Sequence, residues 1–122
     1  MSQIMLQSGY MKIIIRGANI DLTPSIKAFV EEKVGSVEKF INPSDIELAE
    51  ARVEVGKSSQ HHKTGPVFYA EINLKIGSKL LRAVVEHEDL HTAVDFARNE
   101  VEAQLKKEKQ KTIDSHRVSK RV

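Results

Sequence analysis

Hydrophobic residues along this chain follow two different periods, and the switch between them predicts the order of the elements. Residues 12–16 form a short β-branched run closed by a glycine, which is typical of a buried strand. Apolar and polar residues then alternate over 47–55 and again over 69–76, which predicts two half-buried strands. Gly77-Ser78 is a two-residue hairpin turn, and the apolar positions Leu81, Ala83 and Val85 mark the returning strand.

Two segments follow the 3.6-residue period of an amphipathic helix. The first begins with Thr23 as a cap and Pro24 at the first helical position, and it ends at Asn42-Pro43. Its predicted inner stripe is Ile26, Phe29, Val30, Val34, Val37, Phe40 and Ile41. The second helix is capped by Asp89. Its predicted inner stripe is Leu90, Ala93, Val94, Ala97, Val101, Gln104 and Leu105.

This order predicts an α+β fold, a two-layer β-α-β-β-β-α sandwich. We expect a four-stranded sheet with both helices packed on one face and a polar, solvent-facing opposite face. Residues 11–112 would form this single domain. Residues 1–10 lie before the periodic pattern and are interpreted as a non-native extension or an alternative start. Residues 113–122 are expected to be a basic, frayed tail.

Composition limits the function classes. The 122 residues include no cysteine, which removes disulfides and thiolate chemistry. The sequence contains neither a secretory signal nor a run long enough for a membrane helix, so we expect a cytoplasmic protein without a membrane partner. The chain has 19 basic and 17 acidic residues, but residues 102–122 alone hold seven basic and three acidic ones. This asymmetry favours a polyanionic partner.

The basic end of the second helix is the strongest functional candidate. Lys106, Lys107, Lys109 and Lys111 occupy four of six positions, and Glu108 alone cannot pair with all of them. Favourable placement at a helix C-terminus would account for one or two lysines. We therefore expect the helix to extend past the core near Leu105 and to present these lysines to phosphate groups.

Residues 87–91 match the zinc-protease pattern H-E-x-x-H, which needs both histidines one turn apart on a helix. Here His87 closes a strand and Asp89 caps the helix, so coincidence is favoured over a metal site. His61-His62-Lys63 could touch phosphate or metal, but a polar loop is the preferred interpretation. We expect no catalytic centre, metal, cofactor or small-molecule substrate. Phe96 could stack on a base, but packing against the first helix is preferred.

The chain resembles the ribosome hibernation promoting factors, also called ribosome-associated inhibitors, in two motifs. These are Gly17-Ala18-Asn19-Ile20-Asp21-Leu22-Thr23-Pro24-Ser25-Ile26 and Glu86-His87-Glu88-Asp89-Leu90-His91-Thr92-Ala93-Val94-Asp95, the latter followed by Glu102-Ala103-Gln104-Leu105-Lys106-Lys107. The resemblance covers Met11 to Lys111 and includes the element order. It looks like the short form of the family, without a C-terminal dimerising domain.

The resemblance implies a non-enzymatic factor that binds the small ribosomal subunit and its rRNA, or the whole ribosome. Such a factor occupies the decoding and tRNA channel at the subunit interface and silences translation in stationary phase or stress. We expect it to be monomeric off the ribosome. The RNA-binding residues implied or expected are Lys27, Lys33, Lys39, Arg82, His91, Lys106, Lys107, Lys109 and Lys111.

Three positions depart from the family pattern. His91 stands where an aromatic residue is common, and Glu86 and Glu100 stand where lysine is common. Two acids would weaken the middle of the RNA-binding face, and protonation of His91 would make RNA contact sensitive to pH. The alternatives are a generic double-stranded RNA module, which shares the last five elements, and a small zinc hydrolase using residues 87–91.

Overall fold

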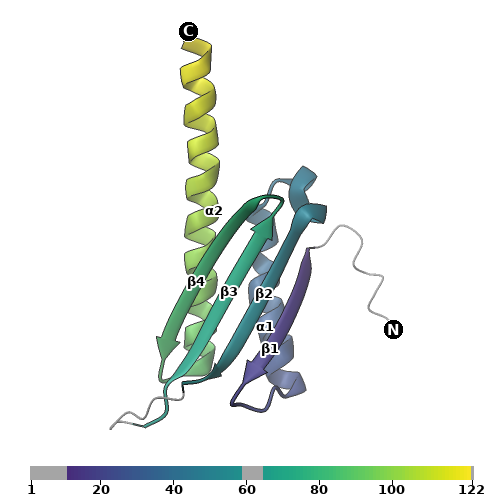
Figure 1. Cartoon of the computed structure of the whole chain (residues 1–122), viewed down its shortest axis with the longest axis vertical. Coiled ribbons are helices and arrows are strands. Elements are labelled where there is room, and N and C mark those ends of the chain that lie inside the picture. The colour runs from purple at the N-terminus through teal and green to yellow at the C-terminus, as the bar shows by residue number, and fades with distance from the viewer. Residues whose placement is uncertain (1–10, 59–64, 122) are drawn as a thin grey trace.

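The fold is a two-layer sandwich in which four strands form one layer and two helices form the other (Figure 1). The computed structural model describes residues 11–58 and 65–121. The strands are β1 (Lys12–Ala18), β2 (Ala49–Lys57), β3 (Phe68–Ile76) and β4 (Lys79–His87). The helices are α1 (Pro24–Gly35) and α2 (Leu90–Arg121), with the short 3-10 helices η2 (Ser36–Phe40) and η3 (Pro43–Leu48) between α1 and β2. The predicted α+β class and element order are confirmed.

The sheet is mixed, with the strand order β1-β2-β3-β4. β1 pairs in parallel with β2, and the other neighbours pair in antiparallel fashion. Ile76 pairs with Lys79 across the predicted two-residue turn, and Gly77 adopts the positive φ that this turn requires. β1 adds a fourth strand to the sheet, so the three-stranded α-β-β-β-α arrangement of the double-stranded RNA module is not the architecture here.

The core lies between the sheet and the helices. Every second residue of β2 and β3 faces the core, and so does the apolar stripe of α2. The buried residues of these three elements are Ala49, Ala51, Val53, Val55, Ala70, Ile72, Leu74, Leu90, Ala93, Val94, Ala97, Val101 and Leu105. From α1 and η2 come Val30, Val34 and Val37. No polar or charged residue of the described chain is buried, so apolar burial holds the layers together.

The first helix is shorter than predicted. Its α-helical part ends at Gly35, and the chain tightens into η2 at Ser36, whose Oγ donates to the carbonyl oxygen of Lys33 at 2.6 Å. A glycine followed by a serine with this local bond weakens an α-helix, which explains the transition. The apolar spacing in the sequence did not predict this transition, because Val37 and Ile41 remain buried after it.

Two further boundaries differ from the sequence prediction. β2 begins at Ala49 rather than at Glu47, because residues 43–48 complete η3. The second helix continues to Arg121, beyond the expected fraying point near Thr112. Figure 1 shows this part of α2 extending past the end of the sheet that carries the β3–β4 turn.

A polar network covers the open face of the sheet. Glu54 accepts hydrogen bonds from the Tyr69 hydroxyl and from the guanidinium of Arg16, which lies on the neighbouring strand. The hydrogen bond to Glu54 and partial burial raise the pKa of Tyr69 to about 12. The same bond, followed by that from Arg16, holds the pKa of Glu54 below its usual range. The charges of Glu54 and Arg16 therefore neutralise each other across two neighbouring strands.

Replacing Gly56 by alanine should destabilise the fold, whereas replacing Gly35 by alanine should not. A Cβ on Gly56 would overlap the Ala18 carbonyl oxygen and lie 3.0 Å from the Tyr69 ring, while a Cβ on Gly35 would meet only the Ile13 side chain at 3.7 Å. We expect urea unfolding to show a loss of about 1–3 kcal/mol for G56A and a gain of about 0.4–1 kcal/mol for G35A. Equal effects would contradict this packing.

The stabilisation lost in Tyr69→Phe should depend on pH in a defined way. The lowered pKa of Glu54 stabilises the fold above the unfolded glutamate pKa, and this contribution disappears as pH falls through the folded value. The raised pKa of Tyr69 stabilises the fold below the unfolded tyrosine pKa of about 10, and this contribution disappears as pH rises towards about 12. Chemical denaturation across pH should show that the free energy of unfolding of the parent protein exceeds that of Tyr69→Phe most between about pH 5 and 9. A constant difference would indicate packing alone.

Candidate nucleic-acid interface

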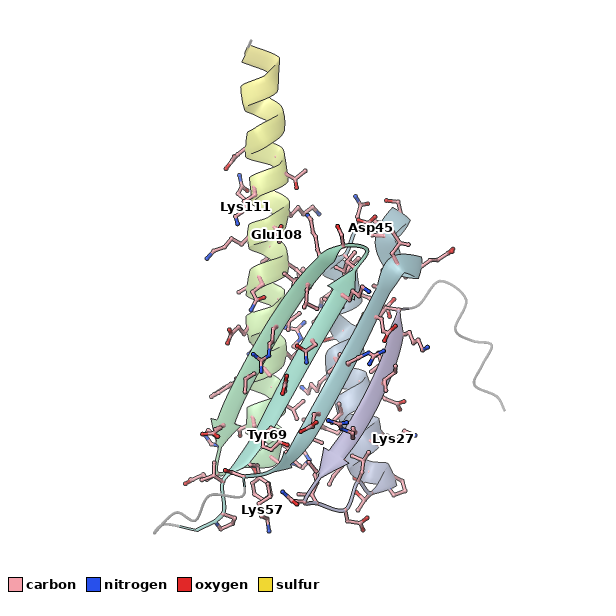
Figure 2. All side chains as sticks on the ribbon, viewed as in Figure 1. Lys27, Asp45, Lys57, Tyr69, Glu108 and Lys111 are labelled. Carbon is pink, nitrogen blue, oxygen red and sulfur yellow. The ribbon has the colours of Figure 1, made fainter. Side chains whose placement is uncertain are left out.

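The predicted basic residues of the helices are distributed along the helix layer rather than gathered at one point. Lys27 is exposed in the first turn of α1, and Lys111 lies on the part of α2 beyond the sheet; Figure 2 shows these two far apart. Lys33 lies between them on α1, where its Nζ is 3.3 Å from an Asp95 carboxylate oxygen of α2. The candidate interface is therefore a strip along the α1–α2 side of the molecule.

The strip is densest around one aromatic ring. Phe40, at the end of η2, has the Nζ of Lys39 5.5 Å and the Nζ of Lys106 5.1 Å from its ring centroid. The guanidinium of Arg98 lies 5.8 Å from the same centroid. The ring attracts cations through its quadrupole, so it gathers charges from η2 and α2 at one place. We call Lys39, Arg98 and Lys106 the Phe40 cation cluster.

Arg98, which sequence reasoning missed, fixes this cluster to the fold. Its Nε donates to Ser36 Oγ at 2.8 Å, and its Nη1 donates to Glu102. Glu102 also accepts from Lys106 at 2.7 Å, and these two bonds, that from Lys106 first, lower the pKa of Glu102. Arg98 thus ties η2 to α2. The only sequence signal was the four-residue spacing between Arg98 and Glu102, which is common on helices.

The lysines beyond the core are more weakly neutralised. Within the part of α2 whose side chains the structure describes, up to residue 114, Leu105 is the last buried residue of the stripe. Lys106, Lys107, Lys109 and Lys111 are all exposed, as predicted. Glu108 is shared between Lys79 at 3.4 Å and Lys111 at 3.8 Å. Lys107 and Lys109 have no ion-pair partner within the described part of the chain. This tip therefore carries uncompensated positive charge.

Arg82 does not join the strip. Its side chain pairs with Glu71 at 3.2 Å on the open face of the sheet, the opposite side from the helices. The two acids that depart from the family pattern are both exposed. Glu86 lies near the end of β4, and a carboxylate oxygen of Glu100 on α2 lies 3.5 Å from the side-chain amide nitrogen of Gln104.

The residues of the H-E-x-x-H match lie on different elements, as predicted. His87 ends β4 and its Nδ1 accepts from the Asp89 N–H at 3.0 Å, while Asp89 caps α2 by accepting from the Thr92 N–H at 2.9 Å. His91 instead packs edge-on against Phe29 of α1, with ring centroids 4.4 Å apart. Among the described residues, no group of three or more metal-ligating side chains comes together.

The preferred prediction for Phe96 is wrong. Its side chain is 52% exposed, and its ring meets His87 at the end of β4, at 5.9 Å, rather than the first helix. The side of α2 that faces α1 is occupied by His91, Asp95 and Arg98, so Phe96 is directed elsewhere. The other candidate loop, His61-His62-Lys63, lies outside the described residues.

Comparison with known proteins agrees with this architecture. Two solved structures share the fold: the N-terminal domain of Thermus thermophilus Protein Y (TM-score 0.64, 23% identity, 80% of this chain and 97% of that one) and a ribosomal subunit interface protein from Coxiella burnetii (TM-score 0.63, 21% identity, 82% and 99%). No helix of the described chain is long and apolar enough to span a bilayer.

Sequence comparison gives the family. The ribosome hibernation promotion factor of Bacillus subtilis (strain 168) is 35% identical over 101 residues, which are 83% of this chain and 50% of that protein. The factor of the same name from Staphylococcus aureus (strain COL) is 32% identical over 95 residues, 78% of this chain and 46% of that protein. This chain thus spans about half the length of these relatives. The family described as sigma 54 modulation protein / S30EA ribosomal protein matches residues 13–113, and the chain belongs to this family.

Proposed function

We propose that this chain is a non-enzymatic ribosome-binding factor that silences idle ribosomes in stationary phase or stress. The observation that carries the proposal is the line of cations along the helix layer, from Lys27 through the Phe40 cation cluster to the uncompensated tip. Relatives that share its sequence are named ribosome hibernation promotion factors. The partner we infer is the rRNA of the small subunit, at the decoding and tRNA channel of the subunit interface, in the cytoplasm.

The mechanism is electrostatic and steric. Lysines that meet phosphates release condensed counterions, which provides affinity without sequence readout. A helix extending past its domain is narrow enough to enter a channel, and its exposed lysines can meet phosphates on more than one side. The bound wedge then excludes messenger and tRNA, so silencing needs no catalytic group.

The tip lysines should dominate binding. Replacing Lys106, Lys107, Lys109 and Lys111 by glutamine keeps good helix formers but removes four charges. If all four lysines meet phosphates, the slope of log K against log salt, measured by sedimentation with ribosomes, should be about 3.6 shallower in the variant than in the parent protein. The variant should also bind much more weakly at every salt concentration.

The matched control removes four cations from the open face of the sheet, namely Lys12, Arg16, Arg52 and Lys75. This variant should sediment with ribosomes nearly as the parent protein does. Binding lost equally in both variants would indicate a response to net charge alone and would contradict a helix-layer interface.

Replacing Glu102 by glutamine should strengthen binding. The carboxylate pairs with Lys106 and Arg98, so its removal leaves their charge available to phosphate. We expect the salt slope of ribosome binding to steepen by about one. Glu50→Gln is the control, because it releases Arg52 from a 2.8 Å pair on the sheet face and should leave the slope unchanged. A weaker slope for Glu102→Gln would show that the pairing is needed to place the cations.

A further inference from the structure

A groove opens where α2 leaves the sheet. It has a volume of about 420 Å³ and lies between α2, the β3–β4 hairpin and the segment formed by η2 and η3. Its apolar walls are Phe40, Ile41, Ile76, Leu81, Leu105 and Ile113. Ile113 is 40% exposed although it lies beside these side chains, so apolar surface continues along the helix past the core. Such a groove suits a flat apolar group.

The charges around the groove cancel. Lys79 pairs with Glu108 at 3.4 Å, and the remaining charged wall residues are Asp45 and Lys109, one of each sign. Figure 2 shows Asp45 on the η3 segment and Glu108 on α2, both at this end of the molecule. A phosphate would therefore find no net attraction inside the groove, whereas an uncharged ring bearing polar edges would be accepted there. Asp45 and Asn42 supply groups that can hydrogen-bond such edges.

Positive charge begins immediately beside the groove. Phe40 is both a wall of the groove and the ring around which the Phe40 cation cluster assembles. Lys39 and Lys106, at 5.5 and 5.1 Å from the ring centroid, are both exposed, and Lys106 also pairs with Glu102 at 2.7 Å. The apolar recess and the pair of cations thus meet at the Phe40 side chain. This arrangement complements a nucleotide, in which a planar base is joined to a phosphate.

We propose that this groove binds an unstacked nucleobase of single-stranded RNA while Lys39 and Lys106 hold the adjoining phosphate. The inference deepens the proposed function and rests on it, because it assigns base contact to a factor otherwise held by backbone charge. An unpaired strand is required, since bases inside a duplex are stacked and cannot enter a recess. Apolar contact with a base is tolerant of sequence, so the groove recognises strandedness rather than a particular base.

The test compares two oligonucleotides of equal charge, an adenosine strand of about ten nucleotides and a strand of the same length built from abasic residues. In fluorescence anisotropy the intact protein should bind the adenosine strand about tenfold more tightly. Ile113→Ser should remove most of this preference. Leu80→Ser, which alters an apolar side chain that is 66% exposed and outside the groove, should retain it. Thermal unfolding confirms that both variants fold.

Equal affinity for the two strands would overturn the proposal, as would equal behaviour of the two variants. Sedimentation of the same proteins with ribosomes separates this failure from failure of the proposed function. A protein that sediments with ribosomes but ignores the base retains its function and lacks the base site. If Ile113→Ser weakens ribosome binding without any base preference in the parent, the groove holds a protein segment, and the nucleobase assignment is wrong.

Discussion

The packing of one apolar stripe of α2 against β3 and β4 determines where the cations of this helix point. Ala93, Val94, Ala97 and Val101 are completely or almost completely buried, so the rotation of the helix about its axis is fixed. A change of one residue in this register would turn every side chain by about 100° and bring lysines towards the core. Because the stripe ends at Leu105, the same helix changes from a core element to a charged extension within one turn.

The two faces of the molecule treat charge differently. On the open face of the sheet, cations are matched across or along the strands by Glu50, Glu54 and Glu71. Exposed pairs of this kind contribute little to stability, so their main effect is to leave that face without a strong field. The α2 tip has fewer acids than lysines. Although the whole chain is nearly neutral, the fold gathers its excess positive charge in one region. That region can steer the protein towards a polyanion.

The sequence predicted most of the architecture because hydrophobic period and cap residues act locally. Thr23 and Asp89 cap their helices as expected, and the hairpin turn lies at Gly77-Ser78. The end of α1 was missed because the Gly35-Ser36 transition leaves the apolar pattern intact.

The candidate site was only partly predictable, since it depends on contacts distant in sequence. The hydrogen bond between Ser36 and Arg98 joins residues 62 positions apart in the sequence, and no local sequence pattern predicts it. Phe96 was misplaced for a related reason: its neighbour His87 belongs to another element. The lysines of the strip were visible in the sequence, and the alternation of the returning strand, with Leu81 and Ala83 facing the core, already favours the open face for Arg82, where it pairs with Glu71.

The most direct test of the helix-layer interface is lysine-reactive labelling of the protein, free and bound to ribosomes, read by mass spectrometry. One experiment reports on both faces. We predict that binding protects Lys106, Lys107, Lys109 and Lys111, while Lys12 and Lys75 on the open face of the sheet remain as reactive as in the free protein. Protection of the sheet-side lysines with continued labelling of the α2 tip would contradict this prediction.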